Sequence, residues 1–150
     1  MKVIVDLNLI IDVLQRREPF FMAAAKVCDV IKNGKCEGIV AAHAVTTLFY
    51  IIRKCTDLTT AKQALDWLMS TFEVAYADKS IFVTTRSMEF SDFEDAVVSA
   101  SAAANSCNYI VTRNLGDFRR SRVKAITPEE FLSLVEQQRS ERRFCFTKTD

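Results

Sequence analysis

The sequence has a single histidine, three glycines and two prolines among its 150 residues. One histidine excludes a His-rich metal centre and argues against a Ser-His-Asp triad. The scarcity of glycine and proline excludes a collagen-like or low-complexity chain and argues against a turn-rich all-β sandwich. The five cysteines are scattered, with no Cys-x-x-Cys pair. The sequence therefore predicts neither a disulfide framework nor a structural zinc site.

Long hydrophobic runs are also missing. The longest uncharged stretches, 38–52 and 96–112, contain polar residues and are shorter than the ~20 residues that span a bilayer. Asp6 and Asp12 interrupt the apolar N-terminal run, which argues against a signal peptide. We therefore expect a soluble, cytoplasmic protein with no membrane partner. We place one domain at residues 1–137 and a basic, mobile tail at 138–150.

Short β-branched runs alternate with amphipathic segments along the whole chain. The strands are expected at residues 2–6, 38–40, 72–76, 108–112 and 123–126. The helices are expected at residues 8–14, 19–33, 44–55, 60–70, 79–88 and 92–105, with a last one from 128 that frays from about 138. This alternation predicts an α/β fold, a three-layer α/β/α sandwich with a central parallel sheet. In such sheets ligands bind beyond the carboxyl ends of the strands.

Four carboxylates have placements that call for a reason. Asp6 ends the first strand, Asp92 and Asp95 begin an otherwise apolar helix, and Asp117 follows the fourth expected strand by five residues. Each acid alone can be a helix cap or a turn residue. If Asp6, Asp95 and Asp117 converge, their mutual repulsion favours a bound divalent cation. Oxygen ligands without His or Cys suit Mg²⁺ or Mn²⁺, and such a metal can activate water against a phosphodiester.

A basic cluster follows the last of these strand ends. Residues 113–124 carry five basic groups against one acid, a net charge of +4. Most charge runs are simply solvated surfaces. This cluster begins at Arg113 and includes Arg119 and Arg120, which are close in sequence to Asp117. We therefore predict that these three arginines bind the phosphate backbone of a substrate.

Three motifs together resemble those of a known family. They are V-D-L-N at 5–8, D-F-E-D-A at 92–96 and Y-I-V-T-R-N-L-G-D-F at 109–118. They are similar to the PIN domain, in particular to its bacterial branch related to the VapC-type toxins, over about residues 1–135. The resemblance implies an α/β/α domain with an acidic pocket for Mg²⁺ or Mn²⁺. It also implies cleavage of single-stranded RNA, a separately encoded antitoxin and a homodimer.

The resemblance assigns roles to individual residues. Asp6, Asp95 and Asp117 match family acids that hold the metal, whereas Asn8, Thr112 and Asn114 match polar positions lining the pocket. Two positions depart from the family pattern. Leu7 stands where a Thr or Ser is usual, and Thr47 stands in the place of a further family acid. His43, one helical turn before Thr47, is either a substitute polar group or an ordinary helix-start residue.

These observations lead to one main hypothesis and two alternatives. The main hypothesis is a metal-dependent endoribonuclease, the toxin of a toxin–antitoxin pair. The first alternative is a PIN-like domain that binds RNA or a protein without cutting, because Thr47 brings no charge. The second is a receiver-like phosphotransfer domain. That class needs an aspartate at a middle strand end, and neither 38–41 nor 72–76 ends that way.

Overall fold

A computed structural model of the chain describes residues 1–146, and the side chains of residues 1–141. It contains five strands, β1 (Lys2–Val5), β2 (Glu37–Val40), β3 (Glu73–Val74), β4 (Tyr109–Val111) and β5 (Ala125–Ile126). The helices are α1 (Leu7–Leu14), α2 (Phe21–Lys32), α3 (Ala42–Cys55), α4 (Leu58–Thr71), α5 (Lys79–Arg86), α6 (Phe93–Ala104) and α7 (Pro128–Phe146), with the 3₁₀ helix η1 (Leu115–Phe118). In the described part of the chain, none of these helices is long and apolar enough to cross a membrane.

The five strands form one sheet in the order β3-β2-β1-β4-β5, and every neighbouring pair is parallel. The first strand is therefore central, with Ile4 opposite both Ile39 and Ile110. Side chains alternate across a strand, so Val3 and Val5 enter one core and Ile4 enters the core on the other face. This burial on both faces explains why residues 3–5 of β1 are all apolar.

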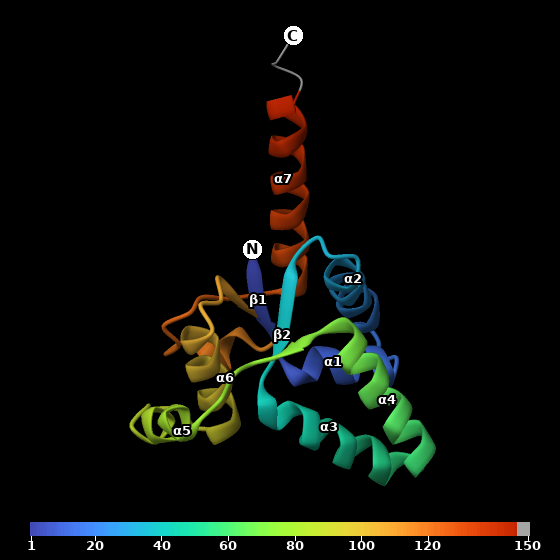
Figure 1. The fold of residues 1–150 in the computed structure, drawn as a ribbon, viewed down its shortest axis with the longest axis vertical. Helices are drawn as coiled ribbons and strands as arrows, with labels where there is room; N and C mark the ends of the chain where they lie inside the picture. Colours follow the sequence, from blue (N-terminus) through green and yellow to red (C-terminus); the bar gives the residue numbers. More distant parts are fainter. Residues whose placement is uncertain (147–150) are drawn as a thin grey trace.

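Helices cover both faces of the sheet, which confirms the predicted α/β/α sandwich. Figure 1 shows α1, α2 and α4 on one side and α5 and α6 on the other. The larger core lies under the first group, where Leu9, Val27 and Leu68 are almost fully buried. The smaller core on the opposite face includes Val98 and Ala102 of α6.

Local chemistry explains where several helices begin and end. The aspartates just before α1, α4, α5 and α6 each accept a hydrogen bond from a backbone N–H of the first turn; they are Asp6, Asp57, Asp78 and Asp92. After α2 the chain turns at Gly34, whose φ of +68° suits glycine. Helix α2 begins at Phe21, so the predicted start at Pro19 is two residues early.

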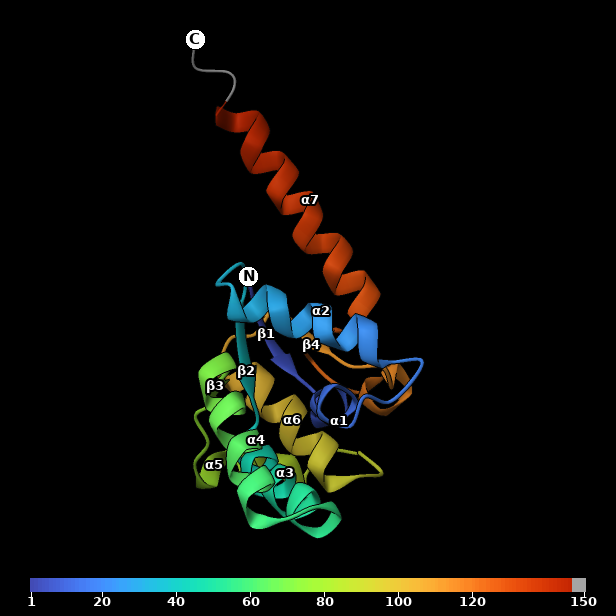
Figure 2. The ribbon, with the colours of Figure 1, turned by 90° about the vertical axis from the view of Figure 1, so that its right-hand side faces the viewer.

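The C-terminal helix is longer than expected. We predicted an irregular chain from about residue 138, but α7 stays helical to Phe146. Its first turns pack on α2 through Phe131, which is fully buried. Figures 1 and 2 show the remainder of α7 projecting away from the body of the molecule. Residues 147–150 lie outside the described residues, and the division into a domain of 1–137 and a mobile tail stays a prediction.

Candidate active site

Asp6 and Thr112 meet at the carboxyl ends of two neighbouring strands. β1 and β4 are paired, and the N–H of Asp6 donates to the carbonyl oxygen of Val111 at 3.0 Å. The Thr112 hydroxyl donates to Oδ2 of Asp6 at 2.8 Å, linking residues 106 positions apart in the sequence. Both side chains are buried, at 5% and 0% exposed. The parallel sheet thus brings together two of the residues predicted for the site.

Asn8 and Asn114 complete the hydrogen bonds around this pair. The backbone N–H and side-chain amide of Asn8 lie 3.4 and 3.5 Å from the carboxylate oxygens of Asp6. The N–H of Asn114 donates to the Thr112 hydroxyl at 3.0 Å. Burial raises the pKa of Asp6, and the hydrogen bonds from Thr112 and Asn8 offset part of that rise. Asn8 therefore favours the ionised form of Asp6, whereas Asn114 orients the Thr112 hydroxyl.

The first turn of α6 brings further acids. Asp92 caps the helix by accepting the N–H of Glu94 at 2.7 Å. The side-chain carboxylate of Asp95 accepts no hydrogen bond from any of the described residues. Its pKa is raised to about 6, first by burial and then by the charges of Asp92, Asp6 and Asp117. A carboxylate with no donor and several acidic neighbours is a position that a cation would stabilise.

A cavity of about 220 Å³ lies between these elements. Five acids line it: Asp6, Asp92, Glu94, Asp95 and Asp117. Asp117 comes from η1, and its own charge contributes to the raised pKa values of Asp6 and Asp95. The three acids predicted to hold a metal therefore share one cavity. No lysine or arginine of the described residues lines this cavity.

The donor set fits a hard divalent cation, although the acids do not converge on one point. Carboxylate oxygens are the ligands that Mg²⁺ and Mn²⁺ prefer. Among the side chains that the structure describes, residues 1–141, no three of His, Cys, Asp or Glu are close enough together to form a ready-made metal centre. A cation here would draw the carboxylates inward or bind partly through water, which Mg²⁺ usually retains.

Helix α3 contributes His43 to the cavity, not Thr47. His43 and Ala44, in the first turn of α3, line the acidic cavity, whereas the half-buried Thr47 does not. Burial lowers the pKa of His43, and Glu94, Asp6 and Asp92 act in the opposite direction. Its Nδ1 is buried without a hydrogen-bond partner in the structure. Of the two interpretations of His43, this placement favours a polar group of the site over an ordinary helix-start residue.

The predicted arginines separate into two places. Arg113 lies away from the acidic cavity, with its Nε 2.9 Å from Oδ2 of the fully buried Asp12. Neither group makes a well-aligned hydrogen bond, so the contact is a close ion pair. The guanidinium also stacks 4.3 Å from the ring centroid of Phe20. The structure thus gives Arg113 a structural partner that the sequence did not predict.

Arg119 and Arg120 lie beside the acidic cavity. Both are exposed, and both line a groove of about 490 Å³ together with Asp117. Asp117 also lines the acidic cavity. The groove therefore continues from the acids to the arginines, as a phosphate-binding role would require.

Two residues of the site were missed or undervalued from sequence. Glu94 lines the cavity but was not singled out, because Asp92 and Asp95 on either side gave the more obvious spacing. His43 was noticed only through its helical spacing to Thr47. Their common signal is position: both lie in the first turn of a helix that follows a strand or loop at the carboxyl edge of the sheet.

Comparison with known proteins agrees with the geometry. Residues 2–116 match the family model described as "PIN domain". A curated protein of Aquifex aeolicus, "Ribonuclease VapC1", is 25% identical over 134 residues, covering 87% of this chain and 92% of that protein.

Solved structures share the fold. VapBC2 from Rickettsia felis, bound to a DNA fragment from its promoter, superposes with a TM-score of 0.66 at 14% identity, covering 85% of this chain and 98% of that one. VapBC-1 from nontypeable Haemophilus influenzae gives a TM-score of 0.63 at 15% identity, covering 86% and 99%. At these identities the likeness concerns the fold alone.

Proposed function

Because this chain belongs to the PIN domain family, we propose that it is a ribonuclease that hydrolyses phosphodiester bonds of single-stranded RNA with the help of Mg²⁺ or Mn²⁺. The observation that carries the proposal is the sharing of Asp117 by two hollows. On one side of Asp117 is the cavity with five acids, and on the other is the groove with Arg119 and Arg120. A cation site directly beside a phosphate-binding groove is what phosphodiester hydrolysis requires.

In this proposal Asp6, Asp95 and Asp117 hold the cation. When bound, the cation lowers the pKa of water and offsets the negative charge of the phosphodiester. Thr112 and Asn8 keep Asp6 ionised and fixed through their hydrogen bonds. Asn114 holds Thr112 in place through its backbone N–H.

The arginines of the groove position the substrate. Arg119 and Arg120 are exposed next to Asp117, so their guanidinium groups can bind the phosphates that flank the cleaved bond. Arg120 does so in exchange for its ion pair with Glu89. The choice of RNA is supported by the similarity to the curated ribonuclease of Aquifex aeolicus. We take single-stranded RNA as the form that is cut, because its unstacked bases and flexible backbone are open to protein contacts.

We further propose that the protein is the toxin of a toxin–antitoxin pair and forms a homodimer. Support for the partner comes from its structural neighbours, which include a toxin–antitoxin complex from Klebsiella pneumoniae with a TM-score of 0.62 at 20% identity. Support for the homodimer comes from apolar side chains that α3 and α4 leave in solvent. Tyr50 is 64% exposed and Met69 is 50% exposed.

The decisive experiment is cleavage of a mixed-sequence single-stranded RNA by the purified protein with Mg²⁺, Mn²⁺ or EDTA. Asp6→Asn should abolish cleavage, because it removes the buried carboxylate at the centre of the site. Asp66→Asn, at an exposed position of α4, is the matched control and should cut like the wild type. Cleavage that persists in EDTA, or in a folded Asp6→Asn variant, would refute the proposal.

One observation favours a second candidate, a domain that binds RNA or a protein without cutting. Helix α3 gives the cavity His43 and no acid, because Thr47 stands in the family acid's place and does not line the cavity. Under this alternative the wild type binds RNA or a protein partner but does not cut RNA with either metal. Efficient cleavage by the wild type would exclude it.

A further inference from the structure

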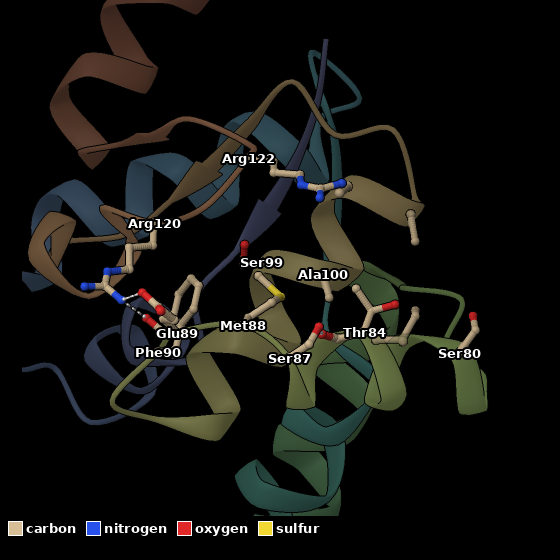
Figure 3. A pocket seen from close by; sticks show the side chains of 13 residues that line it. Ser80, Thr84, Ser87, Met88, Glu89, Phe90, Ser99, Ala100, Arg120 and Arg122 are labelled. Carbon is tan, nitrogen blue, oxygen red and sulfur yellow. Dashed lines mark hydrogen bonds and ion pairs between the residues drawn. The ribbon is translucent and has the colours of Figure 1, made fainter.

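A third cavity, of about 470 Å³, lies between α5, α6 and the chain that follows η1. Figure 3 shows Arg120 and Arg122 on one side of it, Thr84 and Ser80 of α5 on the other, and Met88 between them. Its volume falls within the range of cavities that bind small ligands or parts of larger ones. Apart from Glu89, its lining contains no acid.

The basic side of this cavity is held in place by hydrogen bonds. Ser121, between the two arginines, shares a hydrogen bond of 2.7 Å with the hydroxyl of Ser99 on α6. Arg120 donates to the carbonyl oxygen of Glu89 at 3.1 Å and forms an ion pair with its carboxylate. Arg122 pairs with no acid among the described side chains. The Arg122 charge on the cavity rim is therefore left without an acidic partner among these side chains.

The lining combines an apolar surface with hydroxyl groups. Ile81, Met88 and Ala100 supply apolar contacts, and Thr84, Ser87 and Ser99 supply hydroxyls. A nucleobase has the matching chemistry, since its faces are apolar and its edges carry hydrogen-bond donors and acceptors. A phosphate attached to that base would meet Arg122.

This cavity continues into the candidate active site. Glu89, Phe90 and Arg120 line both the third cavity and the groove that contains Arg119. Asp117 then joins the groove to the acidic cavity. The three hollows thus follow one another along the surface, with acids at one end and the α5–α6 cavity at the other.

We propose that the α5–α6 cavity binds a nucleotide that flanks the cleavage site of the RNA, its base against Met88 and Ile81 and its phosphate on Arg122. This inference rests on the proposed function. It adds a second contact region that determines which RNA is bound. The base at that position is held by the protein while the scissile bond lies at the acids.

The test measures binding separately from cleavage. A fluorescein-labelled 12-nucleotide single-stranded RNA is titrated with the Asp6→Asn protein, and the dissociation constant is measured by anisotropy at several salt concentrations. Arg122→Gln should weaken binding about fivefold at 0.1 M salt. It should also make the fall of the logarithm of the association constant with the logarithm of salt concentration shallower by about 0.7, the value for one phosphate contact to a single strand. Arg86→Gln is the matched control, because Arg86 is exposed on α5 but does not line the cavity.

A second pair of variants fills the cavity without changing charge. Ala103→Phe on α6 and Thr84→Phe on α5 each introduce a ring at an exposed position of the lining. Each should weaken RNA binding by about tenfold, because the ring displaces the base from its apolar contacts with Met88 and Ile81. Two variants are used so that misfolding of one, detected by circular dichroism, leaves the other to decide.

The outcomes separate the two proposals. RNA binding that Arg122→Gln and a filling variant weaken, but Arg86→Gln does not, supports the inference whether or not the wild type cuts. Unchanged binding in a folded filling variant overturns it, even if the wild type is an active nuclease. Equal weakening by Arg122→Gln and Arg86→Gln would indicate diffuse electrostatics and also overturn it. The inference is also overturned if the Asp6→Asn protein binds free mononucleotide but no RNA.

Discussion

The ion pair between Asp12 and Arg113 leads to a prediction about stability. The Asp12 side chain is fully buried, whereas that of Arg113 is 27% exposed. Removing one partner of a buried pair costs about 3–5 kcal/mol, because the other charge is left without compensation. Replacement of either residue should therefore lower the free energy of unfolding well beyond the effect of a surface substitution.

The two replacements should differ in size because the two partners differ in burial. Asp12→Asn leaves Arg113, which can still reach water and stack on Phe20. We therefore expect the free energy of unfolding to fall by the lower end of the range, about 3 kcal/mol. Arg113→Gln leaves a fully buried carboxylate without its cation, so we expect the upper end, about 5 kcal/mol. At roughly 2–4 °C per kcal/mol for a chain of this length, the melting temperature should fall by about 6–20 °C.

The assay is urea unfolding followed by the fluorescence of Trp67, the single tryptophan, with a double-mutant cycle. The double variant Asp12→Asn/Arg113→Gln should cost less than the sum of the single variants, because neither leaves the other charge unpaired. Asp66→Asn, an exposed acid on α4, should change stability by less than about 0.5 kcal/mol. If Asp12→Asn were as mild as Asp66→Asn, and Arg113→Gln instead weakened RNA binding, the substrate role predicted from sequence would be restored.

Three other predictions concern the acidic cavity and the packing of α2 on the sheet. Binding of Mn²⁺ should weaken as the pH falls below about 6, because the raised pKa of Asp95 makes protons compete with the metal. Calorimetric titrations at pH 5 and 7.5 test this, and an affinity independent of pH would contradict it. In the metal-free protein a rise in pH has the opposite effect on stability: the contribution of Asp95 to the free energy of unfolding falls as the pH rises. A raised pKa in the folded state means that Asp95 destabilises increasingly as the pH rises from its unfolded value of 3.8 to about 6, and Asp95→Asn should remove that slope. Gly38→Ala should cost about 1–3 kcal/mol, since a Cβ there would lie 2.6 Å from two Ile31 side-chain carbons. Ile31→Val in the same protein should recover part of that loss in urea unfolding, and a neutral Gly38→Ala would show that α2 can shift.

Local patterns were sufficient to predict the fold. The strand runs, the helix caps and the convergence of Asp6 with Thr112 follow from short segments plus the rule that parallel strands end at one edge. The predicted strand at 72–76 shortens to Glu73–Val74, because β3 is at the edge of the sheet and pairs on one side only. The length of α7 was missed, since residues 136–143 are all polar or charged and lack the apolar stripe that indicates a helix.

Contacts between distant segments could not be predicted in this way. Asp12 is an acid inside an apolar helix and Arg113 follows a strand, and only the packing of α1 beneath the 112–114 segment pairs them. Likewise, nothing in the spacing of α3 indicated that His43, rather than Thr47, lines the acidic cavity. The cavity between α5 and α6 depends on how these helices meet the 120–122 segment, which no motif records.

The central place of β1 has a consequence for the order in which the protein becomes functional during its synthesis. β1 leaves the ribosome before the other strands of the sheet, yet one of its edges stays unpaired until β4 emerges. The hydrogen bond between Thr112 and Asp6 can form only after a further 106 residues have been made. Until then neither Asp95 nor Asp117 nor the groove with Arg119 and Arg120 is in place beside Asp6. The acids of the cavity therefore come together only once translation has passed Asp117, and a nascent chain that ends before β4 has no assembled site.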